Sequence, residues 1–350
     1  MTKKFFASAY SKFAPVDIDD YAHFINSLNE QNTACRVVDR VIVNDGTPEF
    51  DVLNFPEEIP NRFKISINEI KFDCLFDDNK YSDCLMVVFS GARTPKDRMP
   101  MFKRQSFYPF IPMKVLSIAD PMFEKFQELT LGWYYGTKDC DYTRLISVIV
   151  NLVCKKLGIS ENKLFFFGSS GGGYVSLQMA SFYNSSTHVA MNPQIDISSY
   201  PYAKVFKRIT GIDLADRDVF RRNETADIVC QTKANILLVF NFNDRHDCEK
   251  HLFPLCKKLC ISKLNLGLND LGNGKVLWGY NVIGGHNAQG DQFIFTHLMN
   301  LATRISDGDF CISYDDDVMY KNVSSLWRAI EWYIYSLKKT ISEVTSLKNN

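Results

Sequence analysis

The sequence has no excess of charge of either sign and no long hydrophobic run. Its 40 lysines and arginines balance 40 aspartates and glutamates, so no global electrostatic field favours nucleic acid or anionic lipid. No segment reaches the roughly 18 consecutive apolar residues of a membrane span. The basic N-terminus reaches Lys12 and Asp17 before the apolar run of a signal peptide develops. These absences predict a cytoplasmic protein that neither binds nucleic acid nor spans a membrane.

Cysteine patterns typical of zinc sites or disulfide frameworks are also missing. The ten cysteines form no Cys-x-x-Cys pair and several lie within apolar runs, so we expect reduced core thiols and no metal. Internal repeats and low-complexity tracts are absent as well. The 350 residues, 46% of them hydrophobic, are enough for one large α/β domain or two smaller ones.

From Leu85 onward, short apolar runs alternate with longer amphipathic stretches, which is typical of βαβ units that build a parallel sheet. The near-continuous hydrophobicity of the runs suits strands that are buried on both faces. The predicted strands are Leu85–Ser90, Met113–Ile118, Leu164–Gly168, His188–Asn192, Ile236–Phe242 and Val276–Val282. The predicted helices are Tyr142–Leu157, Gly172–Tyr183, Asp247–Leu259 and Gln289–Ile305. Residues 85–305 are therefore predicted to form an α/β core, a mostly parallel sheet flanked by helices.

The segments outside this regular pattern are interpreted separately. Residues 1–84 include the alternating run Arg62–Phe76, which predicts antiparallel strands in an N-terminal region, either a separate domain or the leading edge of the sheet. A polar and aromatic insertion at 200–229 is interpreted as a helical cap over the site. In the C-terminal extension 306–350, the broad apolar face of Ser324–Leu347 predicts a helix that packs onto the body or forms a homo-oligomer.

A Gly-x-Ser-x-Gly motif within Leu164–Tyr174 lies between an apolar run and a helical pattern. A serine at the tip of a tight strand-to-helix turn has a strained backbone, and the residues two before and two after it must be nearly free of side chain. Gly168 and Gly172 meet this requirement around Ser170. The sequence therefore predicts a nucleophile elbow, and a glycine-rich turn with surface serines is the alternative.

A serine hydroxyl is a poor nucleophile unless a base takes its proton, and the base needs a third group to fix its tautomer. His286 follows a predicted strand and a glycine pair, so we interpret it as the base, with His246 and His251 as alternatives. Asp244 follows the end of another predicted strand and is interpreted as the acid. Asp247 is the alternative acid, and the alternative role for either aspartate is the N-cap of a helix, which Asp247 fits well.

Acyl transfer also needs two donors aimed at the tetrahedral oxyanion. The backbone N–H of Gly171 is the expected first donor, and that of Ala92, in a loop of small residues after an earlier strand, is the second, with the preceding glycine as the alternative. Arg93 either holds an anionic substrate group or caps its loop. Asn192 and Gln194, at the exit of another strand, are expected to line the pocket unless they form an ordinary turn.

Over residues 85–305 the chain resembles the α/β-hydrolase superfamily, which uses the chain order serine, aspartate, histidine. Four motifs look more narrowly like hydrolase-fold proteins of bacterial surface-polysaccharide clusters, among them capsule O-acetyltransferases and an accessory secretion protein that acetylates glycan. These motifs are Phe89–Arg93, Gly132–Gly136, Phe167–Gly173 and Asn192–Gln194. The resemblance implies Ser170, Asp244 and His286 as the triad, with the same oxyanion donors. One departure is Asn241–Asn243, where relatives often carry a glycine before the acid.

The function expected from these residues is acyl transfer through an acyl-enzyme on the elbow serine. The acceptor is a glycan hydroxyl or water, so the protein is either an O-acetyltransferase or an esterase, and the resemblance suggests capsule or surface-polysaccharide biosynthesis. We expect no bound cofactor, with acetyl-CoA or another acyl-CoA as a potential co-substrate. The alternative is a non-catalytic accessory protein of glycan assembly that retains the fold.

Overall fold

The computed structural model describes residues 46–94, 96–216, 224–281 and 292–308. Ten strands within these ranges form one sheet, in the order β1-β2-β3-β5-β4-β6-β7-β8-β10-β9. The strands are β1 (Glu49–Asp51), β2 (Arg62–Ile67), β3 (Ile70–Asp77), β4 (Leu85–Phe89), β5 (Lys114–Ile118), β6 (Leu164–Ser169), β7 (Thr187–Met191), β8 (Asn235–Asn241), β9 (Gly267–Gly272) and β10 (Lys275–Tyr280).

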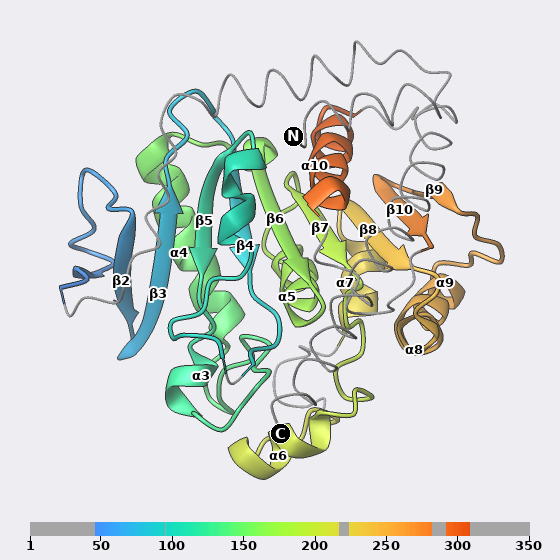
Figure 1. Ribbon diagram of the computed structural model, residues 1–350, viewed down its shortest axis with the longest axis horizontal. Helices are drawn as coiled ribbons and strands as arrows, with labels where there is room; N and C mark the ends of the chain where they lie inside the picture. The colour runs from blue at the N-terminus through green and yellow to red at the C-terminus, as the bar shows by residue number, and fades with distance from the viewer. Residues whose placement is uncertain (1–45, 95, 217–223, 282–291, 309–350) are drawn as a thin grey trace, which may run out of the picture.

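The centre of the sheet is parallel. Neighbouring strands from β5 through β4, β6, β7 and β8 to β10 all run in the same direction. Every residue of β4, β7 and β10 is buried, which agrees with their near-continuous apolar sequences. The six strands predicted from the sequence are confirmed, with ends shifted by one or two residues. Their carboxyl ends share one edge of the sheet, which faces the lower part of Figure 1.

The N-terminal edge adds the antiparallel strands predicted for Arg62–Phe76. β2 pairs antiparallel with β3, and β3 pairs antiparallel with β5, so this part of residues 1–84 continues the same sheet. The chain then crosses over, because β4 lies between β5 and β6. An antiparallel strand beside a parallel sheet, this crossover and a Gly-x-Ser-x-Gly turn after β6 define the α/β-hydrolase fold, as predicted.

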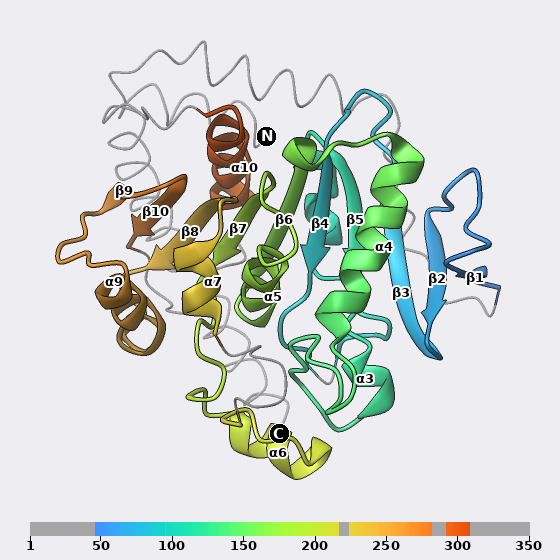
Figure 2. The same cartoon turned by 180° about the vertical axis from the view of Figure 1, so that it is seen from behind.

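Helices cover both faces of the sheet (Figures 1 and 2). One face packs against α4 (Tyr142–Leu157), α5 (Gly171–Met179) and α7 (Thr225–Gln231), and the other against α10 (Gln292–Ser306) and the short helix η1 (Gln105–Phe110). α4 has the predicted bounds because Asp141 caps its first turn, accepting from the N–H of Thr143 at 2.9 Å, and Gly158 ends it at φ 67°. All residues of α5 are buried, so this helix is the centre of the fold.

The predicted helix Asp247–Leu259 is not continuous. It consists of α8 (Arg245–Asp247), the π-helical turn η4 (Cys248–Leu252) and α9 (Phe253–Lys258). Pro254 accounts for the interruption, because its ring has no N–H and would clash with the carbonyl four residues earlier in a regular α-helix. The remaining short helices are α3 (Met122–Lys125), η2 (Glu161–Lys163) and α6 (Ala203–Thr210).

Some predictions concern parts of the chain that the structure does not describe. The expected base His286 and the helix Ser324–Leu347, with its expected oligomer contact, lie outside the described residues. So do residues 217–223 of the expected cap. In the described part of the chain, none of the helices combines the length and apolar character that a bilayer crossing requires.

Candidate active site

Ser170 occupies the tip of the turn between β6 and α5. Its backbone has φ 56° and ψ −121°, a conformation that costs a residue with a Cβ on the order of 1–3 kcal/mol. A Cβ added to Gly168 would lie 2.1 Å from the carbonyl oxygen of Gly172, and one added to Gly172 would lie 2.5 Å from that of Phe89. Both glycines are therefore required for steric reasons, and the turn has the geometry of a nucleophile elbow.

Backbone hydrogen bonds fix Ser170 between two strands and a helix. Its N–H donates to the carbonyl of Met191 at the end of β7 at 2.9 Å. Its own carbonyl accepts from the N–H of Tyr174 in the first turn of α5 at 3.1 Å. The residue is 8% exposed. The serine is thus rigidly placed at the N-terminus of α5, where the helix dipole favours developing negative charge.

The side chain of Gln194 contacts the serine oxygen directly. Its Nε2 donates to Ser170 Oγ at 3.3 Å, while its Oε1 accepts from the indole N–H of Trp133 at 2.5 Å. The tryptophan contact fixes which end of the amide faces the serine. Gln194 is fully buried. The structure therefore brings together Ser170 and Gln194, two of the residues singled out in the sequence. The orientation of the Gln194 amide is set by its contacts with Ser170 and Trp133.

The loop after β4 runs beside the elbow, as an oxyanion site requires. A Cβ on Gly91 would lie 3.1 Å from the carbonyl oxygen of Ser169 and 3.7 Å from Ser170 Cβ, so the backbones approach closely there. Ala92 follows and is exposed. Gly171 is the first residue of α5 and is buried. The assignment of Gly171 and Ala92 as oxyanion donors stays a prediction.

Arg93 is engaged with its own surroundings. Its Nε donates to the carbonyl of Leu129 at 2.5 Å, a terminal N–H donates to the carbonyl of Gln127, and the guanidinium lies 5.1 Å from the ring centre of Phe123. These contacts anchor the loop after β4 to the segment that carries Trp133. These contacts are of the loop-capping kind, and the role of Arg93 in holding an anionic substrate group stays a prediction.

Asp120 and Tyr134, to which the sequence analysis assigned no role, hold the segment of Trp133 in place. Trp133 and Tyr134 have positive φ values of 55° and 52°, and the buried carboxylate of Asp120 accepts from the N–H of Tyr134 at 3.0 Å. Burial raises the pKa of Asp120 to about 7. The Tyr134 hydroxyl bridges the loops, accepting from the N–H of Ser90 at 2.9 Å and donating to a carbonyl of β5. The motif Gly132–Gly136 was noticed only through a resemblance, and the aspartate gave no signal in the sequence.

An aromatic wall extends from Trp133 across the carboxyl end of the sheet. The ring of Trp133 lies 6.2 Å from that of Tyr200 and 5.4 Å from that of Phe206 in α6. Tyr200 in turn lies 6.0 Å from the ring of His246 and 6.3 Å from that of His251. Trp133 itself lies next to the elbow, because a Cβ built on Gly171 would come within 3.5 Å of its indole ring. The start of the insertion 200–229 therefore packs against a residue that borders the elbow.

Asp244 and Asp247, the two expected acids, are both buried at the exit of β8. Asp244 Oδ1 accepts from the N–H of Asp247 at 3.1 Å, so Asp244 is the residue that caps the helix. The cap role was considered for both aspartates; Asp244 fills it at α8, and the Asp247 side chain, at the N-cap of η4, makes no capping hydrogen bond. Because His286 lies outside the described residues, the triad itself is not seen, and the acid assignment stays a prediction.

Asn192 connects three strands. It has φ 41°, its Oδ1 accepts from the N–H of Asn241 in β8 at 2.9 Å, and its Nδ2 donates to the hydroxyl of Tyr280 in β10 at 3.5 Å. The residue is fully buried. Its visible role is to set the spacing of β7, β8 and β10 at the edge that carries the site, next to the turn of Gln194.

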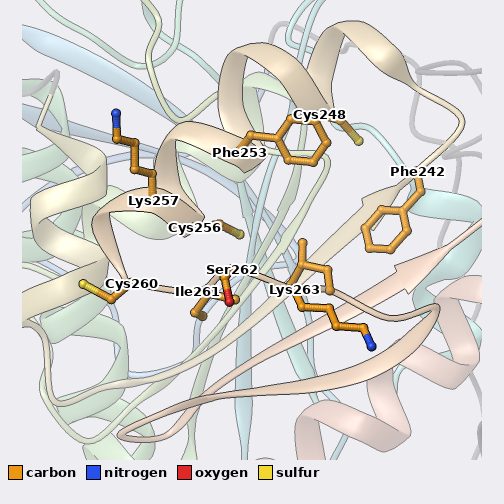
Figure 3. Close-up of a pocket in the computed structure, with 10 residues that line it drawn as sticks. Phe242, Cys248, Phe253, Cys256, Lys257, Cys260, Ile261, Ser262 and Lys263 are labelled. Atoms are coloured by element: carbon orange, nitrogen blue, oxygen red, sulfur yellow. The ribbon is translucent and has the colours of Figure 1, made fainter.

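A cavity of about 740 Å³ lies apart from these residues, between α9 and the segment after it. Phe242, Cys248 and Phe253 line one side, and the side chains of Lys257 and Lys263 extend in different directions (Figure 3). None of its lining residues is an expected catalytic or substrate-binding residue. We assign the site from the convergence on Ser170 and not from the size of this cavity.

Comparison with known proteins finds no matching family model and no matching curated protein. Among solved structures, the capsule O-acetyltransferase of Neisseria meningitidis serogroup A is similar at 17% identity and TM-score 0.49, over 71% of this chain and 96% of that chain. Est1E from Butyrivibrio proteoclasticus is similar at 12% identity and TM-score 0.48, over 71% of this chain and 100% of that chain. A third similar structure is the Glycosylation Associate Protein (Gap123) complex from Streptococcus agalactiae, at 16% identity and TM-score 0.49, over 71% of this chain and 47% of that chain. Such values are too low to carry an argument, so the fold assignment rests on strand order and the elbow.

Proposed function

We propose that this protein is a serine-nucleophile acyltransferase or esterase that works through an acyl-enzyme on Ser170. The observation that supports this most is the strained elbow, because the combination of φ 56° and ψ −121° lies outside the left-handed helical region and persists at a non-glycine residue only where the surrounding structure enforces it. The strained turn presents a hydroxyl at the N-terminus of a buried helix.

In the proposed mechanism, Ser170 Oγ attacks the carbonyl carbon of an ester or thioester while His286 takes the hydroxyl proton. Asp244 stabilises the resulting imidazolium. The backbone N–H groups of Gly171 and Ala92 bind the oxyanion, and its collapse expels the leaving group, which receives the proton from His286. A hydroxyl or water then attacks the acyl-enzyme by the same steps in reverse, which releases the product and regenerates the serine.

Gln194 has a specific role in this scheme. Because its Nε2 donates to Ser170 Oγ, one lone pair of the oxygen is occupied and the hydroxyl proton has to point elsewhere. The direction left open includes the one toward the base. Gln194 is therefore proposed to orient the nucleophile in the free enzyme and to contact the acyl group afterwards. Asn192 supports it from the neighbouring turn.

The acceptor determines whether the enzyme is a transferase or a hydrolase. Trp133 and Phe206 are buried and pack on one side of the elbow beside the half-buried Tyr200, and the accessible part of the Tyr200 ring can contact the apolar face of a sugar ring. We propose a glycan or a related small ester as substrate, with acetyl-CoA as one potential acyl donor and surface-polysaccharide synthesis in the cytoplasm as the setting. One of the similar structures, a mutant of the meningococcal capsule O-acetyltransferase, is a complex of that protein with CoA.

The experiment is to measure the intact mass of the protein after brief incubation with p-nitrophenyl acetate or acetyl-CoA, with and without a glycan acceptor. We expect one added acetyl group, mapped to Ser170, that is absent from Ser170→Ala. Ser169→Ala is the matched control and should still be acetylated at Ser170. The hydroxyl of Ser169 accepts a hydrogen bond from Arg104 at 3.2 Å and has no role in the proposed mechanism. Acetylation of Ser170→Ala to the same extent would contradict the proposal, and so would no acetylation of the wild type by either donor.

A further inference from the structure

A second cluster of reactive side chains lies at the exit of β8, made of His246, Asp247 and His251. One ligand atom from each lies within 4.8 Å of the other two. The closest pair is His246 Nδ1 and Asp247 Oδ1, at 3.5 Å. The two imidazole rings lie 6.1 Å apart, centre to centre. No role in acyl transfer has been assigned to this arrangement as a group.

The π-helical turn η4 is what brings the two histidines together. Residues five apart point roughly 140° away from each other in a regular α-helix, since each residue turns the helix by about 100°. Between His246 and His251 the wider turn Cys248–Leu252 reduces this divergence. Pro254 gives the turn a local cause, and the alignment of the histidines is its consequence. Such single π-turns are often found at functional sites.

The three side chains of the cluster differ in their exposure to solvent. The Asp247 side chain is 3% exposed and His251 is buried, whereas the His246 side chain is 45% exposed and gives access from solvent. Arg245, the cation next to the cluster in sequence, points to Glu249, with Nε 2.6 Å from Oε1. Asp247 thus contributes the buried carboxylate of the cluster and His246 its solvent-facing imidazole.

We propose that His246, Asp247 and His251 bind one divalent transition-metal ion of the zinc class. Two imidazole nitrogens and one carboxylate oxygen are ligands that zinc accepts, with the remaining position open to water. Bonds of about 2.0–2.1 Å place tetrahedral ligand atoms about 3.3 Å apart, close to the 3.5 Å of the His246–Asp247 pair. All three ligand atoms lie within 4.8 Å of one another, so metal binding would draw the remaining pairs closer together.

The ion would act on the acyl-transfer site through the backbone. The N–H of Asp247 donates to Asp244 Oδ1, so fixing the Asp247 side chain also fixes the turn that carries the proposed acid. Tyr200 packs against both histidine rings and links the cluster to the aromatic wall. The site is thus a structural clamp on this turn, and it goes beyond the proposed function, which needs no metal.

The test is a titration of the full-length, chelator-stripped protein with Co²⁺, followed by visible absorption, and with Zn²⁺, followed by calorimetry. We expect one equivalent to bind, with d–d bands of a four- or five-coordinate cobalt ion and without the near-ultraviolet thiolate-to-cobalt band that cysteine ligands would give. Asp247→Asn and His251→Gln should each raise the Kd by more than about a hundredfold, since even groups that only support ligands contribute 10- to 100-fold. The control Glu249→Gln, an exposed carboxylate on the same turn, should bind as the wild type does.

Three results would overturn the proposal. These are no binding at millimolar metal, a thiolate band, and unchanged affinity in both ligand variants. If either buried variant fails to fold, the half-exposed His246→Gln provides the same comparison, and its Kd should also rise at least about tenfold. Because the readout is metal binding, a negative result here does not affect the acyl-transfer proposal. A negative result in the acetylation experiment likewise does not affect the metal-site proposal.

Discussion

Replacing Ser170 by glycine should make the protein more stable than replacing it by alanine. Both variants lack the hydroxyl and its contact with Gln194, so the comparison isolates the Cβ. At φ 56° and ψ −121° the alanine variant keeps strain of about 1–3 kcal/mol, which glycine relieves. The glycine variant is in turn destabilised by about 0.4–1 kcal/mol, because glycine gives the unfolded chain more conformational entropy to lose on folding. The net advantage of Ser170→Gly is therefore about 0.5–2 kcal/mol.

Urea unfolding of the two variants, followed by circular dichroism, measures this difference. Ser147 in α4 is the matched control, because in a helix interior the alanine variant should be the more stable by about 1 kcal/mol. The reasoning requires opposite signs at the two positions. If Ser170→Gly were less stable than Ser170→Ala by the same amount as at Ser147, the elbow would carry no strain and the main support for a nucleophile there would be lost.

Three other outcomes are expected. Asp244→Asn should lower kcat/KM by about 10⁴-fold and Asp247→Asn far less, and the reverse ranking in parallel kinetics would make Asp247 the acid. Gln194→Met should lower kcat/KM by about 2- to 10-fold, because a donor to the serine oxygen contributes about 0.5–1.5 kcal/mol, and unchanged kinetics would contradict its role. The raised pKa of Asp120 favours the folded state fully below pH 4, and this contribution is lost as pH rises toward about 7. The free energy of unfolding of Asp120→Asn should therefore fall less between pH 4 and 7 than that of the wild type, and equal slopes would refute this.

Local patterns explain which parts of the fold could be predicted. The parallel strands are buried on both faces, so each is an apolar run that can be recognised without knowing its neighbours. The elbow has two glycines whose necessity is steric and short-range. β9 was not predicted because Gly267–Gly272 is polar, although the turn after it carries Asn273 and Gly274 at φ 53° and 75°, a recognisable hairpin signal.

The parts of the site that sequence reasoning missed depend on long-range or irregular geometry. Asp120 holds the backbone of Tyr134 fourteen residues later, and nothing in its neighbourhood distinguishes it from a surface aspartate. The His246–His251 spacing has the wrong period for one face of an α-helix, so the nearness of the two rings becomes apparent only with the π-helical turn. A metal site was accordingly not expected from the sequence.

The central claim, that Ser170 is an activated nucleophile, is tested most directly by labelling with a fluorophosphonate probe and locating the adduct by peptide mass spectrometry. The mechanism predicts one adduct, on Ser170 and not on the adjacent Ser169. It also predicts that the rate falls steeply in His286→Gln and declines as pH drops through the titration of a histidine near ~6.5. An adduct on another residue, or no adduct on the wild type, would contradict the claim. Equal labelling of wild type and His286→Gln would contradict the assigned base.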